Sequence, residues 1–180
     1  MFMEKDFNEE EVDRVIELHA VGSPDRSRRG DASEAAFVAR ACSLDFRVAR
    51  PWGNIDPYDV LVGMRREFWR VQVKCASYYQ GHAYRIKGRS RAKKYTKEEI
   101  DFLAAHVVPE NVWYIVPVEA FADMSSLHFN PRVPHRAKYE KYREAWCLLA
   151  CPEKARGWKD IPVLCRCKAL PVRCAVCPHR

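Results

Sequence analysis

Two neighbouring strand-like segments contain the polar side chains whose types and spacing are best suited to chemistry. The first segment, 58–64 (YDVLVGM), is rich in β-branched and apolar residues, and the second, 67–75 (EFWRVQVKC), alternates with a period of two. Only two residues separate the segments, which predicts a tight hairpin in which Met64 pairs with Glu67. That register decides which side chains share a face.

In this register a carboxylate, an amide and an ammonium group lie on one polar face. Asp59 is opposite Gln72, and Lys74 follows two residues later on the same face. Asp59 and the backbone carbonyl of Val73 offer the oxygen ligands that a hard divalent cation prefers. Such a cation polarises a phosphoryl oxygen and helps to generate hydroxide from water, while Lys74 can orient that water or stabilise developing charge. The pattern indicates phosphodiester hydrolysis, although an ordinary strand pair with an Asp59–Lys74 ion pair has the same spacing.

The segments PYDVLV (57–62) and FWRVQVK (68–74) resemble the central motif of the PD-(D/E)XK nuclease superfamily, in particular its Holliday-junction-resolvase-like and homing-endonuclease-like branches. The resemblance implies an α/β (α+β) fold with a restriction-endonuclease-like αβββαβ core, in which helices flank a mixed central sheet. It also implies DNA cleavage that depends on Mg²⁺ or Mn²⁺. The residues that it implies are the catalytic Glu34, Asp59, Gln72 and Lys74, with Asp59, Glu34 and the backbone carbonyl of Val73 binding the metal.

Three positions of the motif leave alternatives open. Gln72 stands where the superfamily usually has Asp or Glu, and an uncharged amide oxygen predicts weaker cation binding. Asp56 is a rival of Asp59 as the metal ligand, although it lies outside the paired strand. Glu34 follows Asp31 by three residues, which is a capping-box spacing and would give Glu34 a purely structural role.

Further elements are expected on both sides of the hairpin. Capping signals and hydrophobic periodicity predict the following order: a helix from Asn8 to about Gly22, a flexible basic loop over 23–30, a helix from Asp31 through Ala41, strands at 46–49 and 83–87, a helix over 97–106 opened by Thr96 and Glu99, a strand at 112–118 and a helix over 137–150. We therefore divide the chain into an N-terminal helix and linker (1–30), a nuclease-like core (31–150) and a basic, cysteine-rich tail (151–180).

Positive charge is concentrated in the second strand of the hairpin and in the residues that follow it in the sequence. The formal net charge is +7, and the stretch between Glu67 and Glu98 has nine Lys or Arg residues and no acid. A surface of one sign attracts polyanions through steering and counterion release, which predicts DNA as the partner. The alternative is a solvated basic face, with the interleaved tyrosines packed on the sheet. The residues expected to bind DNA are Arg85, Lys87, Arg89, Arg91, Lys93 and Lys94.

The C-terminal cysteines form two close pairs, Cys165 with Cys167 and Cys174 with Cys177. Four thiolates at this spacing can surround a structural zinc ion, and His179 could replace one of them. An iron–sulfur cluster and unliganded thiols are the alternatives.

Composition limits the remaining possibilities. The 180 residues, of which 48% are hydrophobic, fit one domain with a small appendage. The uncharged stretches are shorter than the ~18 residues that a membrane span needs, and Glu4 interrupts any secretory signal. We expect a cytoplasmic protein with no membrane partner. No phosphate-loop, dinucleotide-binding, HExxH or GxSxG motif occurs.

The first hypothesis is a metal-dependent DNA endonuclease that works as a homodimer, because cutting two strands requires two sites. The second is a non-catalytic nucleic-acid-binding protein on the same fold, in which Gln72 marks a lost site and the tail binds zinc. A third is a redox or metal-sensing switch that depends on the cysteines.

Overall fold

The computed structural model describes residues 26–150, except residues 54, 65–66, 90–92 and 135–136. The larger of its two sheets consists of β1 (Arg47–Ala49), β2 (Val60–Met64), β3 (Glu67–Ala76), β6 (Phe102–Val107) and β7 (Val112–Pro117) in the order β1-β2-β3-β6-β7. Of its four pairings, β3 with β6 is parallel and the others are antiparallel. The smaller sheet consists of β4 (Tyr79–Gln80), β5 (Ala83–Lys87) and β8 (Ser126–Phe129). The mixed central sheet confirms the predicted fold class.

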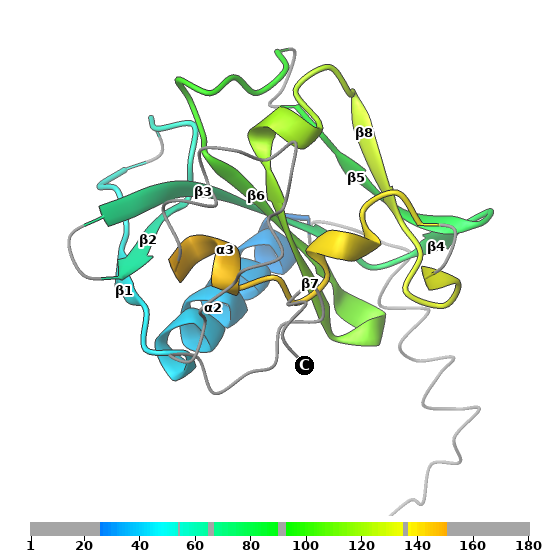
Figure 1. Cartoon of the computed structure of the whole chain (residues 1–180), viewed down its shortest axis with the longest axis horizontal. Coiled ribbons are helices and arrows are strands. Elements are labelled where there is room, and N and C mark those ends of the chain that lie inside the picture. Colours follow the sequence, from blue (N-terminus) through cyan, green and yellow to red (C-terminus); the bar gives the residue numbers. More distant parts are fainter. Residues whose placement is uncertain (1–25, 54, 65–66, 90–92, 135–136, 151–180) are drawn as a thin grey trace, which may run out of the picture.

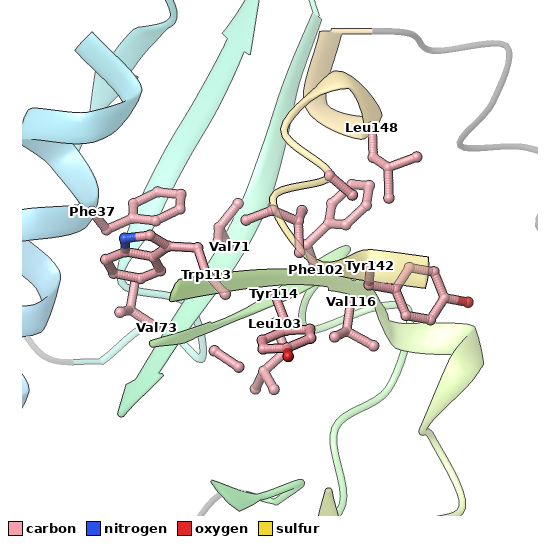
Figure 2. Close-up of a cluster of buried hydrophobic side chains, with 14 of the residues drawn as sticks. Phe37, Val71, Val73, Phe102, Leu103, Trp113, Tyr114, Val116, Tyr142 and Leu148 are labelled. Atoms are coloured by element: carbon pink, nitrogen blue, oxygen red, sulfur yellow. The ribbon is translucent and has the colours of Figure 1, made fainter. Parts of the chain in front are cut away.

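The large sheet lies between helices on one face and the small sheet on the other (Figure 1). Figure 2 shows Phe37, from helix α2 (Arg26–Ser43), against Trp113 of β7, at a ring-centroid distance of 5.5 Å. On the same face, Trp69 Nε1 donates to the carbonyl of Leu149 in the short helix α3 (Cys147–Ala150). On the opposite face, Tyr114 of β7 contacts Phe129 of the small sheet at 4.6 Å.

Helix α2 begins at Arg26, so residues 26–30 are helical and the prediction of a loop there was wrong. Its buried side chains recur every three or four residues, which is the spacing of a helix packed on a sheet. These side chains are Ser33, Phe37 and Ala41. Because Asp31 lies inside the helix rather than at its N-cap, the capping-box role that was open for Glu34 does not exist.

The hairpin has the predicted register, with Met64 opposite Glu67 and Val60 opposite Val71. The two valines are fully buried, as alternation requires. Gly63 is needed for the close approach of the strands, because a Cβ atom there would collide with the carbonyl group of Glu67. The turn residues 65–66 are outside the described part of the chain.

The helix predicted over residues 97–106 is wrong. The side chain of Glu99 accepts a hydrogen bond from Thr96 N at 3.0 Å, so the capping contact forms, but it closes only one turn. Asp101 N then donates to the carbonyl of Arg70, and the chain continues directly as β6. All six residues of β6 are buried between the two layers, and burial on both faces of a parallel strand overrode the local helix signal.

The helix predicted over residues 137–150 is also wrong. Only Cys147–Ala150 is α-helical, after a 3₁₀ turn at Glu140–Tyr142. Glu144 interrupts the helix with a positive φ of 48°, and its backbone N–H donates to the carbonyl of Trp113 at 2.7 Å. The segment thus binds the edge of β7 instead of winding. Further 3₁₀ turns in the described part of the chain include Val108–Glu110 and Val118–Ala120.

Strand β5 has the predicted bounds, but its partners β4 and β8 were not predicted. Both are short, at two and four residues, and β8 has only two buried residues with which to show alternation. Pairing with β5 makes them strands.

Candidate functional site

The polar end of the hairpin is organised around the carboxylate of Asp59. Asp59 directly precedes β2, and its Oδ2 accepts a hydrogen bond of 2.7 Å from the backbone N–H of Val73. The Gln72 amide nitrogen donates to the same carboxylate oxygen and to the Val73 carbonyl, the latter at 3.3 Å. The predicted register therefore does bring Asp59 and Gln72 together on one face.

An open groove of about 610 Å³ joins this hairpin to helix α2 and to the small sheet. Each of the four side chains singled out as catalytic lies on its wall: Glu34, Asp59, Gln72 and Lys74. Asp56 is exposed and does not line the groove. Helix α2 packs against β3 at this end of the hairpin. This packing places Glu34 in the same groove as Asp59 and Lys74, although both come much later in the chain.

Both acids of the groove have raised pKa values, and burial is the main cause in each case. Burial raises the pKa of Glu34, and the negative charge of Asp59 raises it further, while Arg50 and Lys74 lower it. Burial also raises the pKa of Asp59, although the hydrogen bond from Val73 and the charges of Lys74 and Arg50 offset part of that shift. Desolvation and a like charge both disfavour the carboxylate form, and burial raises the pKa of each acid although Arg29, Lys74 and Arg85 line the same groove.

The donor atoms fit a hard divalent cation. Two carboxylates and the Val73 carbonyl are oxygen ligands of the kind that Mg²⁺ and Mn²⁺ take. The Gln72 amide nitrogen lies between the Asp59 oxygen and the Val73 carbonyl, which shows that both oxygens point toward one electropositive partner. Turning the amide by 180° would present Oε1 instead. Among the described residues, no three His, Cys, Asp or Glu side chains form a cluster able to hold a metal, so such a cation depends on neutral oxygens as well.

Arg50 is a residue of the site that sequence reasoning missed. Its Nη2 lies 2.5 Å from Glu34 Oε2, and its side chain is 58% exposed. It follows the short strand β1, at a position where neither spacing nor periodicity marks it as functional. Arg50 is not itself on the groove wall, whereas Arg29 and Tyr78 are, and Arg29 Nη1 donates to the Tyr78 hydroxyl at 2.8 Å.

The residues expected to bind DNA are mostly exposed, but they are not equivalent. Arg85 lines the groove, and Lys87 lies on the same face of β5. Lys93 forms an ion pair with Glu99 at 3.0 Å. Tyr84 is buried, in agreement with the packing role expected as its alternative. Arg89 and Lys94 are exposed and pair with each other through a β-bridge, whereas Arg91 lies outside the described residues.

The four cysteines Cys165, Cys167, Cys174 and Cys177 lie outside the described residues, as do His179 and the segment predicted as an N-terminal helix. Neither helix in the described part of the chain is long and apolar enough to cross a bilayer.

Comparisons with known proteins bear on this geometry. A family model described as PD-(D/E)XK endonuclease matches residues 25–149, a range that includes every residue lining the groove. Among solved structures, the chain is similar to that of a bacterial homing endonuclease, I-Ssp6803I. The sequences are 25% identical, the TM-score is 0.65, and the similarity covers 75% of this chain and 98% of the other. The comparison supports a restriction-endonuclease-like fold. No curated protein sequence gives a match.

Proposed function

This chain belongs to the PD-(D/E)XK endonuclease family, and we propose that it hydrolyses DNA phosphodiester bonds with a divalent cation, Mg²⁺ or Mn²⁺, held in the groove that Glu34 and Asp59 line. The observation that carries the proposal is the pairing of two desolvated carboxylates with Lys74 in one open groove. In a structural ion-pair cluster the cations would lower the pKa values of the acids, whereas burial keeps the pKa values of Glu34 and Asp59 raised.

Each group has a distinct part in the reaction. Glu34, Asp59 and the Val73 carbonyl are the residues that would hold the cation, and a bound cation polarises the phosphoryl oxygen and lowers the pKa of a water molecule. The ammonium group of Lys74 orients the attacking water or stabilises the charge that develops on phosphorus-bound oxygen. Gln72 fixes the orientation of the Asp59 carboxylate through its amide.

A direct test is cleavage of DNA by the wild type, Lys74→Ala and Lys141→Ala in the presence of Mg²⁺ or Mn²⁺. Lys141 is exposed, with its ammonium group over the Tyr142 ring at 5.0 Å, and it does not line the groove, so it is a matched control for loss of one ammonium group. The substrates are a supercoiled plasmid library with randomised inserts, which contains rare target sequences, and a synthetic four-way junction. We expect cation-dependent cutting by the wild type and Lys141→Ala, and a loss of roughly 10²–10³-fold in Lys74→Ala.

Cutting that persists in folded Lys74→Ala would place the active site elsewhere. If the folded wild type binds the DNA but cuts no substrate with either cation, the non-catalytic interpretation of Gln72 is correct and the proposal fails. Circular dichroism melting of each variant establishes that it is folded.

We also propose that the chain acts as a homodimer, because cutting both strands of a duplex requires two grooves of opposite polarity. The loop after β1 supports self-association, since it exposes Trp52 and Ile55 almost completely, at 100% and 95%. The molar mass from light scattering tests this.

A further inference from the structure

The outward face of strands β5 and β8 consists of polar side chains at regular spacing. Tyr84 and Ile86 point inward from β5, and Leu127 and Phe129 point inward from β8. The alternate residues point outward, and the register pairs them directly across the two strands. This set, which we call the readout face, consists of Arg85 opposite His128 and Lys87 opposite Ser126.

The readout face stands on a rigid support. Behind it, Phe129 packs against Tyr114 of the large sheet, and the Tyr84 hydroxyl donates to Glu110 at 2.9 Å. Gly88, which follows β5, leaves no room for a side chain, because a Cβ atom would lie 2.7 Å from the backbone carbonyl oxygen of Met124. Side chains held on such a ribbon project at fixed positions, and fixed position is what discrimination between similar ligands requires.

The chemistry of the face suits base edges. Arg85 can donate in a fork to guanine O6 and N7, and Ser126 and His128 can each donate or accept. Neither strand contains an acidic residue, and the nearest acid in the chain is Asp123 in the turn before β8. A two-stranded ribbon is narrow enough to enter the major groove of duplex DNA, where every base pair presents a distinct pattern of donors and acceptors.

The readout face lies where DNA bound in the catalytic groove would reach it. Arg85 lines the same groove as Asp59 and Lys74, so the readout face and the candidate catalytic site share a wall. On the other side, Ser126 and His128 border a second hollow of about 780 Å³, which leaves them open to a partner. A duplex whose backbone lies in the catalytic groove therefore passes directly over β5 and β8.

We propose that the readout face enters the DNA major groove beside the cleaved phosphate and selects the target sequence through Arg85 and His128. This inference rests on DNA being the substrate, as in the proposed function. It gives two surfaces of the protein different roles. The catalytic groove acts on the DNA backbone, while the readout face discriminates between bases.

The test separates base recognition from charge. A randomised duplex library is selected for binding to the wild type, Arg85→Lys, His128→Ala and Lys94→Ala, with Ca²⁺ in place of Mg²⁺ so that binding is measured without cutting. Arg85→Lys keeps the charge but loses the planar fork of donors. We expect it to lose base preference at one position by between about fivefold and about 150-fold, the range that one bidentate base contact contributes, with an unchanged salt dependence. His128→Ala should relax a neighbouring position.

Lys94→Ala is the matched control for a backbone contact. It should weaken binding to all sequences equally and reduce the salt slope by about one, with the base preference unchanged. If Arg85→Lys and His128→Ala retain the wild-type preference, or if they weaken all sequences equally, the readout face does not select bases and the inference is wrong.

The outcomes keep this inference apart from the proposed function. If the wild type binds selectively through these residues but does not cut, the nuclease proposal is wrong and the readout face is supported. If the wild type cuts DNA and both variants keep its base preference, the readout face is wrong and the nuclease proposal stands. A wild type with no affinity for DNA contradicts both.

Discussion

Two arginine–carboxylate pairs of nearly equal exposure stand in opposite electrostatic surroundings. At the groove, the lining residue Glu34 lies 2.5 Å from Arg50, with the Arg50 and Glu34 side chains 58% and 20% exposed. Behind the small sheet, Arg132 lies 2.7 Å from Glu110, with side chains 55% and 25% exposed. Yet the pKa of Glu34 is raised, first by burial and then by Asp59, whereas Arg132 and the Tyr84 hydroxyl lower the pKa of Glu110.

The difference lies in the stronger effect of burial on Glu34 and in the third neighbour of each pair. Glu110 accepts from the neutral hydroxyl of Tyr84 as well as from Arg132, so its charge is stabilised from two sides. Glu34 is desolvated and has a second carboxylate, Asp59, as its neighbour, and both raise its pKa. An ion pair in which the acid has a lowered pKa stabilises a fold, while two desolvated acids with raised pKa values are suited to binding a cation.

The largest expected effect comes from Asp59→Asn. The amide keeps an oxygen acceptor for Val73 N but removes a negative ligand, so we expect cleavage to fall by roughly 10²–10³-fold or more. Without cation, the melting temperature should stay equal to that of the wild type or rise, because the substitution removes a charge that burial disfavours. Plasmid cleavage and calorimetric melting in chelator measure the two. A clear drop in metal-free melting temperature would show that the Asp59 charge is compensated after all.

The pH dependence of cation binding gives the next largest effect. The raised pKa values of Glu34 and Asp59 mean that each carboxyl keeps its proton to a higher pH when folded than when unfolded. Protons therefore compete with the cation at pH values above the ordinary carboxyl range, and affinity should rise with pH by up to about tenfold per unit for each proton displaced, then level off. Titration calorimetry with Mn²⁺ over a pH series tests this, with Asp59→Asn as control. Affinity that is constant down to the ordinary pKa of a glutamate contradicts the assignment.

The smallest effect is expected for Glu110→Gln, the same carboxylate-to-amide change in the compensated pair. It should lower the melting temperature by only a few degrees, and less at high salt, because partly exposed ion pairs are screened. Cleavage well below the melting temperature should be unchanged, since Glu110 does not line the groove. If Glu110→Gln instead raised the melting temperature, as is possible for Asp59→Asn, the Glu110–Arg132 pair would not differ from the Glu34–Arg50 pair in the way described.

Local signals predicted the hairpin and failed for the segments that flank it. Two residues between alternating strands leave little freedom of register, so the pairing of Met64 with Glu67 could be derived from the chain alone. The segment after Thr96 has a true capping contact and good helix formers, but β3 and β7 provide a slot in which β6 buries all six of its residues. A burial gain of that size exceeds a helix preference of a few tenths of a kcal/mol per residue.

The sequence by itself determined the chemistry of the hairpin, because Asp59, Gln72 and Lys74 are close in the chain and alternation decides their face. Only the tertiary structure decided which distant groups join them. The packing of α2 on the sheet places Glu34 at the groove, where the loop after β1 supplies Arg50 as its partner. The chain then passes from β3 into the small sheet, which places Arg85 on the groove wall. Such contacts depend on how layers pack, and no short-range spacing encodes that packing.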